Sequence, residues 1–205
     1  MKTIVTVILF FLTVSLGIGA PFRDSATGLV FPDVIAEWTK VQETKYPEKD
    51  LGVAIGYNRG DSDKLTIYIY SRGYFSIESG GLDLRLGREL ADVASGIETA
   101  WGRKGAQVFA LTKIAELKEG SCSHIIALGS AHRIIYDSQS HTSLSAVAGY
   151  KNRIFKVRYT YKGIDLEQGV ESVAELMRIL IRENVRDLDP FFDCIVADGS
   201  GKQEK

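Results

Sequence analysis

The stretch LGVAIGYNRGDSDKLTIYIY, residues 51–70, contains two runs of alternating side chains around a polar turn. Alternation with period 2 predicts β-strands. The second run has bulky side chains on both of its faces, so we expect a central strand that is covered on both sides. Gly, Asp and Ser between the runs favour a turn, and the stretch predicts a β-hairpin. The residues expected on one face are Leu51, Val53, Ile55 and Tyr57 in the first run, and Leu65, Ile67 and Ile69 in the second.

Two amphipathic helices are expected after this hairpin. Residues 84–101 repeat apolar side chains at spacings of three and four, with Arg85, Arg88, Glu89, Asp92 and Glu98 around the other side. The apolar stripe consists of Leu86, Leu90, Val93, Ile97 and Trp101. A second helix should begin after Asp165, with Gln168 completing a capping box. Its stripe is Leu166, Val170, Val173, Leu176, Met177 and Leu180.

Five further segments have strand character. Residues 38–46 contain β-formers but few apolar side chains, which favours an edge strand. Residues 106–117, 123–137, 142–150 and 152–162 follow one another with short connections, so antiparallel neighbours are expected. The architecture predicted is therefore α+β: a mostly antiparallel sheet of about seven strands packed against two main helices, an α/β/α sandwich.

The first 20 residues have the features of a signal peptide. One Lys at position 2 precedes an apolar run over residues 4–16, shorter than the roughly 20 residues that a membrane-spanning helix needs. A cut after Gly19 would keep Pro21 away from the scissile bond, and a cut after Ala20 would not. We expect a secreted or periplasmic protein with one domain over residues 21–205 that ends in a polar tail, about 198–205.

The cysteine pair Cys122 and Cys194 has two interpretations. In an oxidising compartment the two residues could form a disulfide, and otherwise they would be separate buried thiols. A structural zinc site needs four ligands, and Cys122 with His124 supplies two.

Few residues suggest catalysis. His132 and His141 flank an expected hairpin turn and could approach each other, with Asp137 beside them. This cluster is the one place where acid–base or metal chemistry is conceivable, and hairpin histidines without a catalytic role are the alternative. No nucleophile, phosphate-loop or metalloprotease motif is present, so no cofactor or metal is expected.

A basic run and a group of tyrosines are the binding candidates. The run could hold an anion or an acidic partner, or it could be a solvated face with acidic cross-strand neighbours. The tyrosines could line a groove or could be ordinary sheet residues under a helix. Tyr68, Tyr70 and Arg158 are the residues we single out. The complete groups are Lys151, Arg153, Lys156, Arg158 and Lys162, and Tyr57, Tyr68, Tyr70 and Tyr74.

Two segments carry a family resemblance. LGVAIGYNRGDSDKLTIYIYSRG and AGYKNRIFKVRYTY resemble secreted bacterial proteins of unknown function that have an LGxSVGY…ATVYVYxxG hairpin and a late GYRGxFVKVRxTY strand. The order of elements is similar to PsbP, a subunit of the oxygen-evolving photosystem, and to its non-photosynthetic relatives. The resemblance implies an antiparallel sheet with helices packed on it, and a non-catalytic role in binding or assembly.

The function expected is that of a non-catalytic binding or assembly factor of the cell envelope, with another envelope protein or envelope component as its partner. Two alternatives remain: a hydrolase-type enzyme with a site near the 132–141 hairpin, and adhesion through Arg59, Gly60 and Asp61. Without residues 1–20 the chain has 24 basic and 26 acidic side chains, which argues against nucleic acid as a partner.

Overall fold

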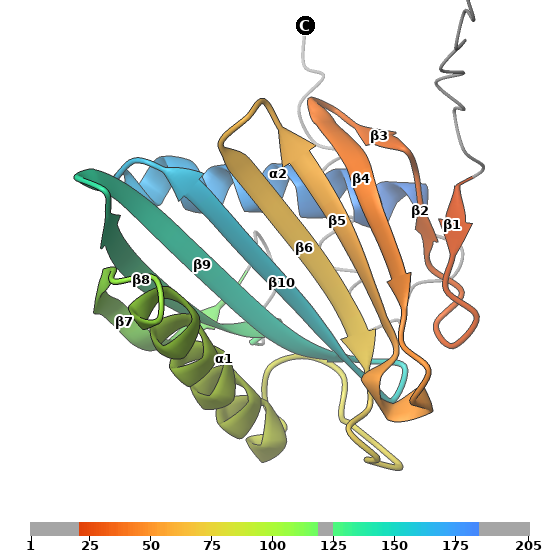
Figure 1. The fold of residues 1–205 in the computed structure, drawn as a ribbon. Coiled ribbons are helices and arrows are strands. Elements are labelled where there is room, and N and C mark those ends of the chain that lie inside the picture. Colours follow the sequence, from red (N-terminus) through yellow and green to blue (C-terminus); the bar gives the residue numbers. More distant parts are fainter. Residues whose placement is uncertain (1–20, 119–124, 185–205) are drawn as a thin grey trace, which may run out of the picture.

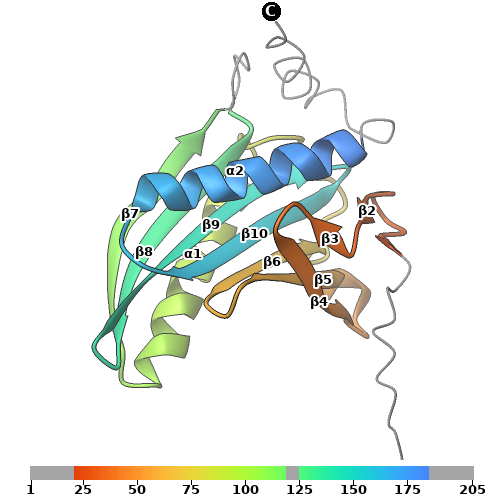
Figure 2. The ribbon, with the colours of Figure 1, turned by 90° about the horizontal axis from the view of Figure 1, so that it is seen from above.

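An antiparallel sheet of eight strands forms the centre of the computed structural model, which describes residues 21–118 and 125–184. Its strand order is β3–β4–β5–β6–β10–β9–β8–β7. The strands are β3 (Val34–Ile35), β4 (Trp38–Lys45), β5 (Val53–Arg59), β6 (Asp63–Tyr70), β7 (Gln107–Leu117), β8 (Ala127–Tyr136), β9 (Gln139–Tyr150) and β10 (Arg153–Lys162). Helices α1 (Leu84–Gly102) and α2 (Leu166–Glu183) lie on opposite faces of the sheet (Figures 1 and 2). This confirms the α+β sandwich.

The seven expected strands correspond to β4–β10, and three short strands add to them. Strands β1 (Phe22–Arg23) and β2 (Val30–Phe31) pair with each other, and β3 pairs with β4. Each has two residues, too few to show a repeating pattern in the sequence. The edge position expected for residues 38–46 is nearly correct, because only the two residues of β3 lie beyond β4.

The β5–β6 hairpin has the predicted faces, with one correction. The strands pair antiparallel, with Ile55 opposite Ile67, and both side chains are fully buried. The turn is made by residues 60–62, where Gly60 has φ 59°. Leu51, expected on the buried face, instead lies in a short 3₁₀ helix (Lys49–Leu51) and is 47% exposed. The strand starts two residues later because this helical turn comes first.

Helix α2 is fixed at both of its ends. At the start, the Asp165 carboxylate accepts a hydrogen bond from the backbone N–H of Gln168 at 3.0 Å, which confirms the predicted cap. At the end, the Asn184 amide donates to the carbonyl of Val30 at 2.9 Å and accepts from its N–H at 2.6 Å. Leu176 and Leu180 are buried against the sheet. The Tyr161 hydroxyl also donates to the carbonyl of Asp165 at 2.5 Å, so β10 holds the start of the helix and β2 holds its end.

Helix α1 packs through Leu86 and Leu90 onto the strand residues Tyr70, Val147 and Ile154. Most of its contacts with the sheet are with β7, β8 and β9. The same face of β6 and β10 lies beside the helix, not under it (Figure 1). Asp83 caps the helix by accepting from the N–H of Arg85 at 3.0 Å, and the Arg85 guanidinium lowers the pKa of this carboxyl to about 2.

The helical stripe of α1 needs one correction. Glu89, expected among the solvent-facing charges, is 3% exposed. A buried carboxylate requires partners, and those partners come from the sheet, as described below. The spacing of Arg85 and Glu89 places both residues on the same side of the helix. It does not show whether that side faces solvent or meets a neighbouring strand.

Several expectations concern residues outside the described ranges. The signal peptide over residues 1–20, the cysteines Cys122 and Cys194, and the polar tail about 198–205 all lie there. Within residues 21–118 and 125–184, neither helix is long and apolar enough to cross a membrane.

Candidate functional site

A cavity of about 330 Å³ separates part of α2 from the sheet. It lies over β7, β8, β9 and β10, and most of the side chains that line it are apolar. From α2 the lining includes Val170, Val173, Ala174 and Met177. We call this space the α2 cavity.

The α2 cavity forms because the sheet beneath the helix loses bulk from one strand to the next. One row of opposed residues runs Ile55–Ile67–Val157–Ala146–Gly129, from β5 to β8. The first three side chains fill the space under α2, whereas Ala146 and Gly129 leave it unfilled. Protein interiors are normally packed as densely as organic crystals, so a gap of this size is unusual. Neighbouring positions repeat the pattern with Ala131 and Ala148.

Helix α2 leaves apolar surface unburied at this place. Val170 is 48% exposed, although its position in the stripe predicted burial, and Val173 and Met177 are half-buried. Leu176 and Leu180 are buried in the core, whereas the flank of the helix that carries Val170, Val173 and Met177 lies above side chains too small to reach it. The sequence alone showed the stripe correctly but gave no sign that part of it lacks a partner.

The cationic residues Lys118 and Arg178 are also part of the lining. Lys118 is exposed, and Nη1 of Arg178 contacts Oε1 of Glu171 at 2.9 Å. The α2 cavity therefore combines an apolar interior with positive charge among the residues that border it.

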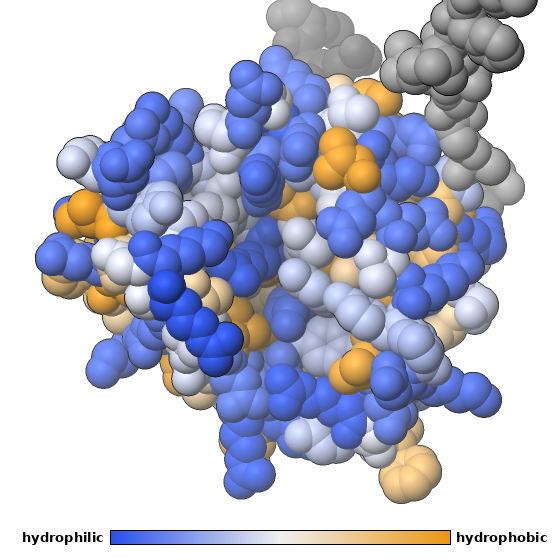
Figure 3. Space-filling model, in the orientation of Figure 1, coloured by the Kyte–Doolittle hydropathy of each residue, from blue (hydrophilic) through white to orange (hydrophobic). Residues whose placement is uncertain are grey.

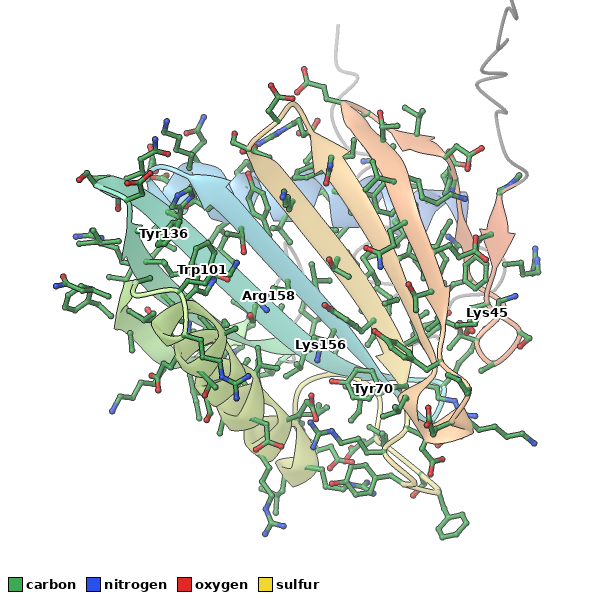
Figure 4. All side chains as sticks on the ribbon, viewed as in Figure 1. Lys45, Tyr70, Trp101, Tyr136, Lys156 and Arg158 are labelled. Atoms are coloured by element: carbon green, nitrogen blue, oxygen red, sulfur yellow. The ribbon has the colours of Figure 1, made fainter. Side chains whose placement is uncertain are left out.

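The opposite face of the sheet gathers the three binding candidates of the sequence. Tyr68 and Tyr70 of β6 and Arg158 of β10 lie on the face that α1 borders, together with Lys156 (Figure 4). The ammonium of Lys156 lies 4.5 Å from the ring centre of Tyr68 and 4.8 Å from that of Tyr70. Tyr57, also considered, is buried on the other face, where its hydroxyl donates to the carbonyl of Pro32 at 2.8 Å.

A buried carboxylate connects this cluster to α1. Glu89 accepts a hydrogen bond from the Tyr70 hydroxyl. Its Oε2 is 2.6 Å from Nε of Arg72, and its Oε1 is 3.5 Å from Nζ of Lys156. Burial, and then the bond to Glu89, raise the pKa of Tyr70, so this hydroxyl remains a donor. Burial lowers the pKa of Lys156, which the Glu89 charge opposes. The sequence missed Glu89, and the one available signal was its place beside Leu90 in the stripe.

Arg158 lacks the acidic neighbours that we expected for an outward basic face. Its cross-strand neighbours are Thr66 on β6 and Ser145 on β9. Those of Lys156 are Tyr68 and Val147. The expectation of acidic cross-strand neighbours is therefore wrong for both residues. Burial lowers the pKa of Arg158.

Asp137 and His141 line one surface pocket together with Trp101, and His132 is not part of it. His132 is 1% exposed, and burial lowers its pKa. His141 stacks on Trp101 with 5.9 Å between ring centres. Asp137 has φ 49° in the turn between β8 and β9. Over residues 21–118 and 125–184, no three His, Cys, Asp or Glu side chains are grouped so as to hold a metal ion.

The Arg59 side chain next to the RGD turn is engaged inside the protein. Its Nη2 lies 2.8 Å from Oδ2 of Asp63, 3.0 Å from the Tyr159 hydroxyl and 3.2 Å from the Ser172 hydroxyl. Its guanidinium also lies 4.8 Å from the ring centre of Trp38. This arrangement gives Arg59 a structural role in joining the hairpin to α2.

Comparisons with known proteins identify likenesses of layout. No protein-family model matches the sequence, and no curated protein matches it either. Among solved structures, cyanobacterial PsbP (CyanoP) from Synechocystis sp. PCC 6803 is similar with a TM-score of 0.46 and 13% identity. The match covers 80% of this chain and 92% of that one. A mutant of the protein Mog1 is similar with a TM-score of 0.37 and 8% identity, over 78% of this chain and 88% of that one. The resemblance to PsbP that the order of elements predicted is therefore found among solved structures as well.

Proposed function

We propose that this chain is a non-catalytic binding protein that holds a hydrocarbon group, of the acyl-chain class, in the α2 cavity. The observation that carries the proposal is the cavity itself: about 330 Å³ of space with a mostly apolar lining under a helix that Tyr161 holds at its start and Val30 at its end. Small-molecule sites typically measure about 300–1,000 Å³ and are mostly apolar.

The driving force for such binding would be the hydrophobic effect. Val170, Val173 and Met177 already expose apolar surface that a hydrocarbon would remove from water. An enclosed apolar cavity of about 150 Å³ binds benzene, so the larger space under α2 has room for a hydrocarbon group. Lys118 and Arg178 provide positive charge in the lining, which suits a chain with an anionic end.

The place of action that we propose is outside the cytoplasm. The apolar segment at the start of the sequence is the support for this, and an envelope lipid or lipid-modified envelope component would supply the acyl chain. This agrees with a binding or assembly role and requires no catalytic group.

The proposal can be tested with the neutral fluorescent probe N-phenylnaphthylamine and with palmitate as its competitor. We expect the probe to bind to the wild type and palmitate to displace it. The variant Ala174→Phe places a ring in the cavity from α2 and should abolish probe binding, because Ala174 lines that space. The matched control is Ala100→Phe, the same change at an exposed position of α1, which should leave binding unchanged.

Three results would contradict the proposal. These are no saturable probe binding to the folded wild type, equal binding by Ala174→Phe and Ala100→Phe, and a concentration-dependent dimer that buries Val170. In the last case a second copy of the chain, and not a hydrocarbon ligand, would cover the apolar surface. Urea unfolding of both variants would establish that each is folded.

A further inference from the structure

A row of polar side chains crosses four strands on the α1 face. Ser130 of β8 lies opposite Ser145 of β9, Ser145 lies opposite Arg158 of β10, and Arg158 lies opposite Thr66 of β6. Directly opposed residues in antiparallel strands point to the same face, with Cβ atoms about 4.5–5.5 Å apart. We call these four residues the Arg158 row.

The Arg158 row contains buried polar atoms without partners. Ser130 and Ser145 are 5% and 4% exposed, and within the described part of the chain neither hydroxyl makes a hydrogen bond. The adjacent His132 is 1% exposed, and its Nδ1 also has no partner there. Buried polar groups are nearly always hydrogen-bonded, so three such atoms in one small region need an explanation.

The positive charge of Arg158 is also uncompensated. Over residues 21–118 and 125–184 no carboxylate forms an ion pair with its guanidinium, and its neighbours in the row are hydroxyl side chains. Nearby, Glu89 is shared between Lys156 and Arg72, and Asp92 contacts Arg72 at 2.9 Å. Glu89 and Asp92 are therefore engaged by Lys156 and Arg72.

The surface is hollowed at this place. Figure 3 shows a recess between α1 and the middle of the sheet, and Figure 4 shows Arg158 and Lys156 on the sheet at its side. On this face of the sheet Thr66, Tyr68, Arg158 and Thr160 are half-buried. A small group could reach the guanidinium from solvent without unfolding the helix.

We propose that the Arg158 row binds one oxyanion group, a carboxylate or a phosphate, in the recess beside α1. The planar guanidinium presents parallel N–H donors that match two oxygens of such a group. Hydroxyls rotate freely, so Thr66 and Ser145 can donate to the anion, and Ser130 can donate to the hydroxyl of Ser145 opposite it. Lys156 adds a second positive charge two residues along the same strand. The side chains of the row lie on the face opposite α2, and Ser130 and Ser145 are also among the sheet residues that line the α2 cavity.

The experiment is an NMR titration of the isotope-labelled protein with sodium phosphate and, in a second arm, with sodium acetate, at constant ionic strength. We expect saturable shifts at Ser130, Ser145 and Arg158, and the arm with tighter binding identifies the chemistry of the group. Arg158→Gln should weaken that binding by about tenfold or more, because charge-assisted hydrogen bonds are lost. Lys162→Gln is the matched control, since it removes one charge from the same strand and face outside the row. It should change the affinity by about twofold or less.

Equal affinity in Arg158→Gln and Lys162→Gln would overturn the proposal, as would shifts that never saturate in either arm. If Arg158→Gln does not fold, Arg158→Lys and Ser145→Ala decide. The first keeps the charge and loses the paired donors, and the second keeps the charge and loses one hydroxyl. Both should weaken binding measurably, and unchanged affinity in both would show that the row is not the site.

Discussion

The two faces of the sheet are completed by different chemistry. On the α2 face, the opposed residues shrink from Ile67 to Gly129, and the helix above them leaves an apolar cavity. On the α1 face, a buried Glu89 joins the helix to a tyrosine, an arginine and a lysine of the sheet and the loop that follows β6. One row further along that face, Arg158 has hydroxyl side chains as its cross-strand neighbours and no ion pair with a carboxylate of the described residues.

Unfilled space therefore favours different ligands on the two faces. Apolar contact is non-directional, so unfilled space under α2 loses dispersion and leaves room for any hydrocarbon of suitable shape. Polar contact depends on defined donors and acceptors, so an incomplete polar row presents a particular set of unpaired atoms. The same sheet thus offers a site selective by shape on one face and a site selective by charge on the other.

The largest expected effect is a loss of stability in α1. It tests whether this helix, which has polar contacts with the sheet, belongs to the core as α2 does. Leu90 is 1% exposed. Leu90→Asp removes a core side chain, typically about 2–5 kcal/mol, and buries a charge without a partner at further cost. Since domains are stable by about 5–15 kcal/mol, we expect the variant to lose cooperative unfolding in urea. Arg88→Asp, two residues away at an exposed position, should unfold cooperatively near the wild-type midpoint. Similar midpoints for both variants would show that α1 is not seated on the sheet as described.

A smaller loss of stability is expected when the buried carboxylate of Glu89 is removed. Comparison with the exposed carboxylate of Asp92 shows how much of that loss depends on burial. Glu89→Gln leaves Lys156 and Tyr70 without their acidic partner. Breaking a buried pair costs about 3–5 kcal/mol, and we expect about 3 kcal/mol because Arg72 is 42% exposed and keeps Asp92. Asp92→Asn is the matched control, since it removes another carboxylate from the same Arg72 at a position 59% exposed. It should cost about 1 kcal/mol or less. Equal losses in urea unfolding would mean that Glu89 is solvated.

The sequence predicted those elements whose pattern is local. Period-2 alternation identified β5, β6 and β10, and the spacing of Leu86, Leu90 and Ile97 identified the buried side of α1. Asp165 was identified as a cap because its bond to Gln168 lies within one helical turn. The short strands β1, β2 and β3 were missed, since two residues carry no period.

The candidate sites were predicted only where one strand or one hairpin contained them. Tyr68 and Tyr70 are neighbours on β6, and Arg158 reaches them because β10 pairs with β6. The α2 cavity depends on register, because Gly129 matters only once it lies opposite Ala146 and beneath α2. No pattern within a single segment carries that information. Glu89 was predicted to face solvent for a similar reason, because tertiary packing determines which strand meets its side of the helix.

The smallest expected effect is a dependence of stability on pH. It comes from His132, which lies next to the Arg158 row on the polar face. Burial and the positive charge of Arg158 lower the pKa of His132, while Glu98 raises it by a smaller amount than burial lowers it. The unfolded chain takes up a proton near pH 6.5, and the folded state does so only at lower pH. The unfolding free energy should therefore fall as the pH decreases below about 6.5, by no more than about 1.4 kcal/mol per pH unit for this one proton.

His132→Gln should flatten that part of the profile relative to the wild type, with the difference growing from pH 7 to pH 5. Urea unfolding at pH 7, 6 and 5 measures it, and parallel profiles for the two proteins would show that His132 is freely protonated in the folded state. Because Arg158 contributes to the low pKa, adding the anion that binds to the Arg158 row should reduce the slope in the wild type and leave it unchanged in His132→Gln.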